Sequence, residues 1–208
     1  MKRKTFLTIL GGLIVGASVK AQKYKVDGGL AAITRKQIPQ RSRAVRPAGS
    51  ISERNFVSHC TACQLCVSQC PTRILKPSTR LENWMQPELQ YDEGYCMITC
   101  NRCSQVCPTG AINPIAKEEK AVIQIGHARW IAANCVVGTD HVTCDNCAEH
   151  CPTGAIQMID GTQQGYSYPI PAIDESRCIG CGKCEYLCPA RPFSAIVVDG
   201  LDTQITQI

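Results

Sequence analysis

The chain has 208 residues and a net charge of +5, and its hydrophobic content of 44% includes sixteen Cys. Aromatic residues make up only 5%, so an ordinary apolar core is too small to hold the chain together alone, although a charged fraction of 19% is too low for wholesale disorder. Because no apolar run reaches about 20 residues, a polytopic membrane protein is excluded.

The positive charge is concentrated at the N-terminus. Residues 1–47 contain eleven Lys and Arg and a single acid, a net charge of +10, whereas residues 48–208 have a net charge of −5. The sequence therefore predicts a basic arm on a mildly acidic body. The positive net charge of the whole chain is no reason to expect nucleic-acid binding.

Residues 1–21 have the pattern of an export signal or an N-terminal membrane anchor. A basic start precedes an apolar stretch from Phe6 to Val19, which as a helix would span about 21 Å, too short for the bilayer core. The segment Arg3-Lys4-Thr5-Phe6-Leu7 resembles a twin-arginine signal, with Lys4 where the second Arg usually stands. A Sec-type signal, a plain anchor and a fortuitous cytoplasmic pattern are the alternatives.

Residues 22–50 are predicted to be a basic linker, because they combine Gly28-Gly29, Pro39 and Pro47 with little periodicity. This linker could lie against an anionic membrane surface or remain a solvated tether. The folded domain is predicted to span residues 51–200, with a C-terminal tail at 201–208.

A motif of four Cys occurs four times within residues 51–200. In every copy the last Cys stands four positions after the third and precedes a Pro. The first and fourth copies are compact Cys-x2-Cys-x2-Cys-x3-Cys-Pro runs, whereas the second begins with a three-residue gap and the third with an eight-residue gap. The motifs are Cys60, Cys63, Cys66 and Cys70; Cys96, Cys100, Cys103 and Cys107; Cys135, Cys144, Cys147 and Cys151; and Cys178, Cys181, Cys184 and Cys188.

This spacing suits iron–sulfur chemistry. Three thiolates at two-residue intervals can wrap one [4Fe–4S] cube, while the fourth ligates the other cluster in two-cluster ferredoxins. The Pro then fixes the direction in which the chain leaves. A single motif therefore cannot complete a cluster, so the motifs must pair, and the sequence predicts four [4Fe–4S] clusters with all sixteen Cys as ligands.

Other interpretations of the Cys are weaker. A disulfide scaffold suits an exported protein with an even Cys count, but Cys two residues apart within one run are poor disulfide partners. Zinc ribbons use paired Cys-x2-Cys knuckles, without the further Cys-x3-Cys-Pro. Fewer than four clusters, or a [3Fe–4S] site in an irregular second or third motif, remains open.

The segments around the motifs predict an α+β fold of two dicluster ferredoxin-like modules, in which strand, cluster loop, short helix and strand repeat. Glycines after or within the motifs are expected in turns with positive φ. The expected strands are Val122–Ile125, Ile156–Ile159, Ile170–Ile173 and Ile196–Val198, and the glycines are Gly110, Gly154, Gly180 and Gly182.

The pairing of motifs has two solutions. Sequential pairing joins the first motif with the second and the third with the fourth, whereas nested pairing joins the first with the fourth and the second with the third. Because the first and fourth motifs share the compact spacing and the other two are both irregular, we expect nested pairing.

The chain resembles the MauM/NapG family of ferredoxin-type proteins between about Arg46 and Val198. The lead-in Arg46-Pro47-Ala48-Gly49, the position of Phe56, the long loop after Cys135 and the run Cys178–Glu185 carry the resemblance, while the spacing of the second motif departs from the family. The resemblance implies a periplasmic, membrane-associated electron carrier with four [4Fe–4S] clusters. It also implies a membrane-bound iron–sulfur partner that oxidises quinol, and a redox enzyme as acceptor.

Clusters with four thiolate ligands leave no iron open to substrate, so we expect an electron-transfer protein and not an enzyme. The alternatives are an enzyme with an open cluster and an assembly or maturation factor for a periplasmic redox enzyme. No nucleic-acid partner is expected.

Overall fold

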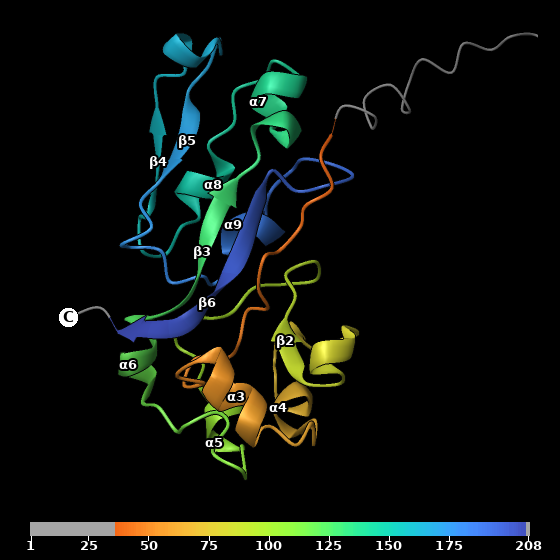
Figure 1. Cartoon of the computed structure of the whole chain (residues 1–208). Coiled ribbons are helices and arrows are strands. Elements are labelled where there is room, and N and C mark those ends of the chain that lie inside the picture. The colour runs from red at the N-terminus through yellow and green to blue at the C-terminus, as the bar shows by residue number, and fades with distance from the viewer. Residues whose placement is uncertain (1–35, 207–208) are drawn as a thin grey trace, which may run out of the picture. The chain divides into compact units, whose positions relative to one another are not determined.

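The structure is a computed structural model, and it describes residues 36–206 (Figure 1). The predicted export signal at residues 1–21 and residues 22–35 of the predicted linker lie outside the described residues. Within residues 36–206, no helix combines the length and the apolar character needed to cross a membrane.

Most of the helices are single turns at the ends of cluster loops. The longest, α3, begins after Ser52, whose hydroxyl accepts a hydrogen bond from the Asn55 amide at 3.2 Å and so caps the helix. The helices are α3 (Glu53–His59), α4 (Leu65–Ser68), α5 (Arg102–Gln105), α6 (Lys117–Lys120), α7 (Val136–Thr139), α8 (Asn146–Glu149) and α9 (Lys183–Tyr186), with 3-10 turns η1 (Leu81–Asn83), η2 (Ala132–Asn134) and η3 (Thr162–Gln164).

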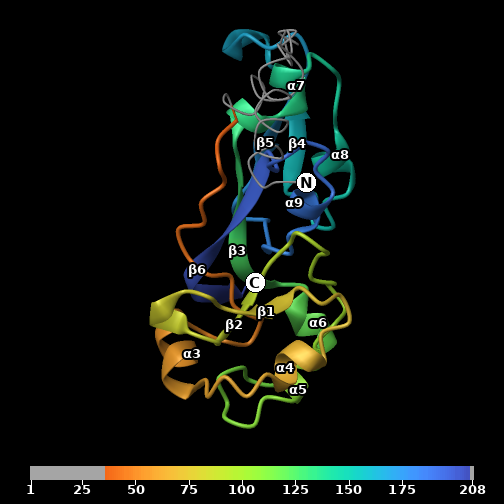
Figure 2. The same cartoon turned by 90° about the vertical axis from the view of Figure 1, so that its right-hand side faces the viewer.

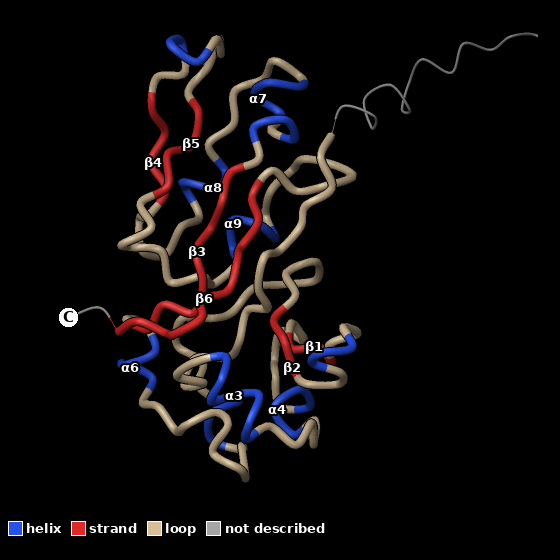
Figure 3. Tube along the Cα trace, in the orientation of Figure 1, coloured by secondary structure: helices blue, strands red, loops and turns tan. Residues whose placement is uncertain are grey.

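The described strands form three antiparallel pairs, β1 with β2, β3 with β6 and β4 with β5 (Figure 3). The strands predicted at Ile156–Ile159 and Ile170–Ile173 are confirmed as β4 and β5, and the other two are longer than expected. The strands are β1 (Leu75–Pro77), β2 (Pro87–Leu89), β3 (Ile123–Trp130), β4 (Ile156–Ile159), β5 (Ile170–Ile173) and β6 (Ile196–Thr206). The mixture of short helices and strand pairs is the predicted α+β fold.

The folded body extends beyond residues 51–200 at both ends. Residues 44–50 are all buried, and the Val45 carbonyl accepts the Leu89 amide at 2.9 Å. At the other end, β6 continues to Thr206, and the Gln204 amide donates to the Ile51 carbonyl at 2.6 Å. Because both segments hydrogen-bond to the folded body through backbone groups, neither behaves as a free linker or tail.

The elements of the first two motifs gather at one end of the described body. Both views show α3, α4, α5, β1 and β2 together there, α7, α8, β4 and β5 at the other end, and the β3–β6 pair running between them (Figures 1 and 2). Helix α4 packs against α5, and α8 packs against α9. We call the region of the first and second motifs module 1 and that of the third and fourth motifs module 2.

Glycine is required where the modules meet. Gly182 has φ +75°, and a Cβ there would lie 2.1 Å from the ring of the buried Tyr91. Gly180 has φ +72° and lies against the backbone of Gly126 in β3. The predicted positive φ is confirmed at these positions and at Gly110 and Gly154.

Candidate iron–sulfur cluster sites

The sixteen Cys, all of them free thiols, gather into four groups of four. Pockets lined mostly by apolar side chains define three groups, which we call sites A, B and C. Site A has Cys60, Cys63, Cys66 and Cys107. Site B has Cys96, Cys100, Cys103 and Cys70. Site C has Cys135, Cys144, Cys147 and Cys188.

The remaining four thiols, Cys178, Cys181, Cys184 and Cys151, form site D. Burial raises the pKa of Cys178, and a charge on Cys151 raises it further. Cys181, whose pKa burial raises to about 12, is also subject to the charge of Cys151. The last Cys of the third motif therefore lies close to the loop Cys of the fourth.

The expectation of nested pairing is wrong, because each module joins two consecutive motifs. Cys70 completes site B and Cys107 completes site A, while Cys151 and Cys188 exchange in the same way in module 2. The physical reason is the hairpin between the motifs of each pair. The β1–β2 hairpin returns the chain from the first motif to the second, and β4–β5 returns it from the third to the fourth.

The fourth Cys of a motif sits in a cradle of neutral hydrogen-bond donors. Backbone amides donate to Sγ in three motifs, from Ile112 to Cys107 at 3.4 Å, from Ala155 to Cys151 at 3.3 Å and from Ala195 to Cys188 at 3.3 Å. Burial opposes ionisation of Cys107, but the amides of Ile112 and Thr109 outweigh it and lower the pKa of this thiol. The Pro-Thr-Gly-Ala-Ile segment after Cys107 thus builds a site that favours its thiolate.

The loop thiols behave differently. Burial raises the pKa of Cys103 and of Cys147 to about 12, and that of Cys66 to about 11. These thiols therefore stay protonated at neutral pH unless a metal takes the place of the proton.

The donor sets fit iron–sulfur clusters. Within residues 36–206, no group of three or more His, Cys, Asp or Glu converges on the position of a single metal ion. The thiols instead form four groups of four, and a [4Fe–4S] cube is held by four Cys thiolates. At site C the buried indole N–H of Trp130 lines the pocket beside Cys135, whose pKa is raised by burial and partly lowered by a hydrogen bond from this indole, so the N–H is placed to donate to sulfur at the site.

The sites approach one another in a fixed order. Within module 1 the charge of Cys66 in site A opposes ionisation of the buried Cys103 in site B. Within module 2, Cys147 of site C acts in the same way on Cys184 of site D. Between the modules, the Cys96 amide of site B donates to the Cys181 carbonyl of site D at 2.8 Å.

Tyr91 is buried at the junction between the modules. It is 1% exposed, and its hydroxyl donates to the Gly180 carbonyl at 2.7 Å. Burial raises the pKa of Tyr91 well above its usual value, and charges on Cys96 and Cys181 raise it further. A neutral phenol therefore lies between the thiols of sites B and D.

Comparison with known proteins agrees with this arrangement. Residues 59–111 and 142–191 each match the family of 4Fe-4S dicluster domains. The methylamine utilization ferredoxin-type protein MauM of Methylobacillus flagellatus is 30% identical over 172 residues, which cover 76% of this chain and 69% of that protein. MauM of Methylophilus methylotrophus is 32% identical over 163 residues, covering 72% and 69% of the two chains. The ferredoxin-type protein NapG of Escherichia coli is 29% identical over 184 residues, covering 79% and 77%.

The paired cluster loops and the dicluster matches define an iron–sulfur protein of the ferredoxin type, whose chemistry is electron transfer. Within that class, the chain belongs to the MauM/NapG family.

Three functional positions were not found from the sequence. Lys120 lies in a Lys-Glu-Glu-Lys run that has the composition of a solvated surface turn, and Tyr91 has no motif around it. Trp130 lies outside every Cys motif, and besides lining site C it contacts Tyr166 with ring centroids 5.8 Å apart. Only the distance of each residue from a Cys Sγ or a cluster loop identifies it, and that distance depends on the tertiary fold.

Proposed function

We propose that this protein carries four [4Fe–4S] clusters, one in each of sites A to D, and relays electrons along them. The grouping of the thiols four by four supports this count, with the fourth Cys of each motif exchanged between partners. Each cluster would add electron-transfer capacity and leave no iron open to substrate.

The contacts between sites favour the order A, B, D, C. Sites A and B share module 1, sites C and D share module 2, and the hydrogen bond from Cys96 to Cys181 makes B and D the neighbours across the junction. The two ends of the route would be A and C. At site A, Cys63 is exposed, so electrons could enter or leave there.

We further propose that the chain works in the periplasm at the membrane surface. The twin-arginine-like start supports this location, because a cluster protein must fold around its metal before export and the twin-arginine route carries folded cargo. The resemblance to MauM and NapG favours a membrane-bound iron–sulfur partner that oxidises quinol as donor, with a periplasmic redox enzyme as acceptor. Fractionation of cells that produce the full chain, with the intact mass of the product, tests location and cleavage together.

Iron and sulfide counting on anaerobically purified full-length protein tests the cluster count. About sixteen irons and sixteen sulfides per chain, with interacting EPR signals after reduction, are expected. A value near four irons, or a colourless protein, would contradict the proposal.

The relay is separated from a maturation role by assaying the acceptor enzyme from a strain that lacks this protein. An enzyme that is active with reduced viologen but inactive with quinol identifies a relay. An enzyme that is inactive with both donors identifies a maturation factor.

A further inference from the structure

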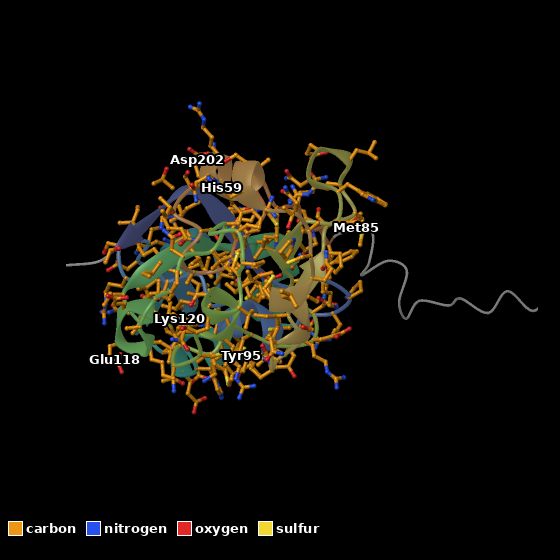
Figure 4. All side chains as sticks on the ribbon, turned by 90° about the horizontal axis from the view of Figure 1, so that it is seen from below. His59, Met85, Tyr95, Glu118, Lys120 and Asp202 are labelled. Carbon is orange, nitrogen blue, oxygen red and sulfur yellow. The ribbon has the colours of Figure 1, made fainter. Side chains whose placement is uncertain are left out.

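Lys120 is a buried cation in contact with a thiol of site B. It is 6% exposed, at the end of α6, and its Nζ donates to the Cys96 Sγ at 3.0 Å and to the Met97 carbonyl at 2.6 Å. The Glu119 carboxylate accepts the Ala116 amide at 2.8 Å and so closes the α6 turn that carries Lys120. Figure 4 shows Glu118 at the rim of the body and Lys120 further in.

The charge of Lys120 has no carboxylate partner among residues 36–206. Two other cations near the sites are neutralised, since Arg46 pairs with Glu53 and Arg41 pairs with Glu185. Arg102 also lines the pocket of site B, but it is exposed to water, which screens its charge. The natural counter-charge of Lys120 is therefore the thiolate and cluster that site B would hold.

In the described residues no other Cys Sγ accepts a hydrogen bond from a charged side chain. Sites A, C and D receive backbone amides, as from Ala128 to the Cys178 Sγ at 3.4 Å, and Thr hydroxyls lie within hydrogen-bond distance of Cys107 and Cys151. A charged donor forms a hydrogen bond about twice as strong as a neutral one. Site B is thus set apart from the three sites it resembles in ligands.

We propose that Lys120 raises the reduction potential of the cluster in site B, an inference that rests on the proposed function. Reduction adds one negative charge to the cluster, and a fixed positive charge in contact with a ligating sulfur stabilises the reduced form more than the oxidised form. Because the α6 turn holds Lys120 against Cys96 beforehand, the charge needs no rearrangement when an electron reaches the cluster. Lys120 acts through its charge beside the Cys96 sulfur, and it is not a cluster ligand.

The location of site B gives this effect a use. Site B is the site of module 1 that adjoins module 2, because the Cys96 amide donates to the Cys181 carbonyl of site D. The same Cys96 accepts the hydrogen bond of Lys120 at its Sγ. A raised potential there holds the electron at the junction, where the next step crosses between modules.

The test is an anaerobic, EPR-monitored redox titration of the full-length protein with its clusters, comparing Lys120→Met with Lys117→Met. Lys117 is the matched control, because it lies on the same helical turn but is exposed. Lys120→Met should make one cluster at least tenfold harder to reduce, a shift of about 59 mV for a one-electron couple. Lys117→Met should leave all midpoints unchanged, and Lys120→Arg, which keeps the positive charge, should leave the midpoint of site B close to that of the unmodified protein.

The shifted signal is assigned to site B by its absence in Cys100→Ala. If Lys120→Met loses iron, the titration is run on Lys120→Gln, which removes the charge but can still donate to the Met97 carbonyl. Unchanged midpoints in a neutral variant that keeps its iron would overturn the inference, as would an equal shift in Lys117→Met. An iron count far below sixteen in the unmodified protein would instead contradict the proposed function, so the two failures are distinguishable.

Discussion

Arg46 joins the N-terminal segment to the wall of site A, and replacing it with Ala should loosen module 1. The guanidinium makes a two-pronged contact with Glu53, from Nε at 2.8 Å and from Nη2 at 2.6 Å. Its Nη1 donates to the buried Pro87 carbonyl at 2.9 Å, and its Cζ lies 4.6 Å from the centre of the Phe56 ring. Pro87 and Phe56 both line the pocket of site A.

The size of the effect follows from burial. Arg46 is 3% exposed, and removing one partner of a buried ion pair costs about 3–5 kcal/mol because the other charge stays behind. The Glu53 side chain is 26% exposed and can regain water, which favours the lower end, about 3 kcal/mol. Arg46→Lys should recover part of this loss, since Lys keeps the charge but cannot reproduce the two-pronged contact.

Iron release to a chelator in mild urea measures this change, because release follows the population of the opened module when opening is fast and reversible. A loss of about 3 kcal/mol should speed release from module 1 roughly 100-fold or more and leave module 2 nearly unchanged. Arg43→Ala is the control, because Arg43 is exposed. Release from Arg46→Ala within about threefold of the unmodified protein would refute the assigned role of the ion pair.

Two further changes test the pairing of motifs and the junction. Cys70→Ala should abolish the EPR signal of the site B cluster, and loss of the site A signal alone would contradict sequential pairing. Burial raises the pKa of Glu185 above its ordinary 4.5, and Arg41 opposes this shift. Because the folded protein favours the protonated carboxyl, the contribution of Glu185 to stability is present below pH 4.5 and is lost as the pH rises through the raised pKa. Arg41→Ala should therefore cost about 1–3 kcal/mol, more at about pH 8 than at about pH 5.5. Urea titrations should show that Glu185→Gln removes this pH dependence, and its persistence would exclude Glu185 as the source.

The local structure of the cluster loops was predictable because it is local chemistry. Cys spacing, the Pro after each fourth Cys and the glycines with positive φ are constraints that act over fewer than ten residues. The strands β4 and β5 were also predictable, since short runs rich in Ile flank the motifs. These features depend on neighbours in sequence, so one sequence is enough to find them.

The pairing of motifs was not predictable in the same way. Similar spacing in the first and fourth motifs reports a similar loop, whereas contact between motifs depends on the hairpin that returns the chain. The β1–β2 hairpin has three residues in each strand, and its Leu75–Leu89 and Pro77–Pro87 partners carry no clear alternating pattern. The inward position of Lys120 was hidden for a related reason, because only the fold places the α6 turn over Cys96.

Removing the iron should unfold the described body, because the proposed clusters act as its cross-links. Cys60 and Cys107 in site A are 47 residues apart, and Cys135 and Cys188 in site C are 53 residues apart. Closing a loop of about 50 residues restricts the unfolded chain by about 4 kcal/mol in the chain-entropy model. The links of sites B and D close shorter loops, with 33 residues from Cys70 to Cys103 and from Cys151 to Cys184, and contribute slightly less each. The four links together total about 15 kcal/mol, as much as the whole stability of a typical domain, about 5–15 kcal/mol.

The loss should be visible by NMR after oxidative chelation of the anaerobic protein. We expect the dispersed amide signals of residues 44–206 to collapse as iron falls below one atom per chain, and to return when iron and sulfide are restored. A sample taken through the same steps without chelator is the control. The buried thiols cannot replace the links, because those whose pKa is raised by burial remain protonated at neutral pH. Native dispersion in iron-free protein would show that the apolar contacts around Phe56, Ile74 and Ile196 hold the fold without the clusters.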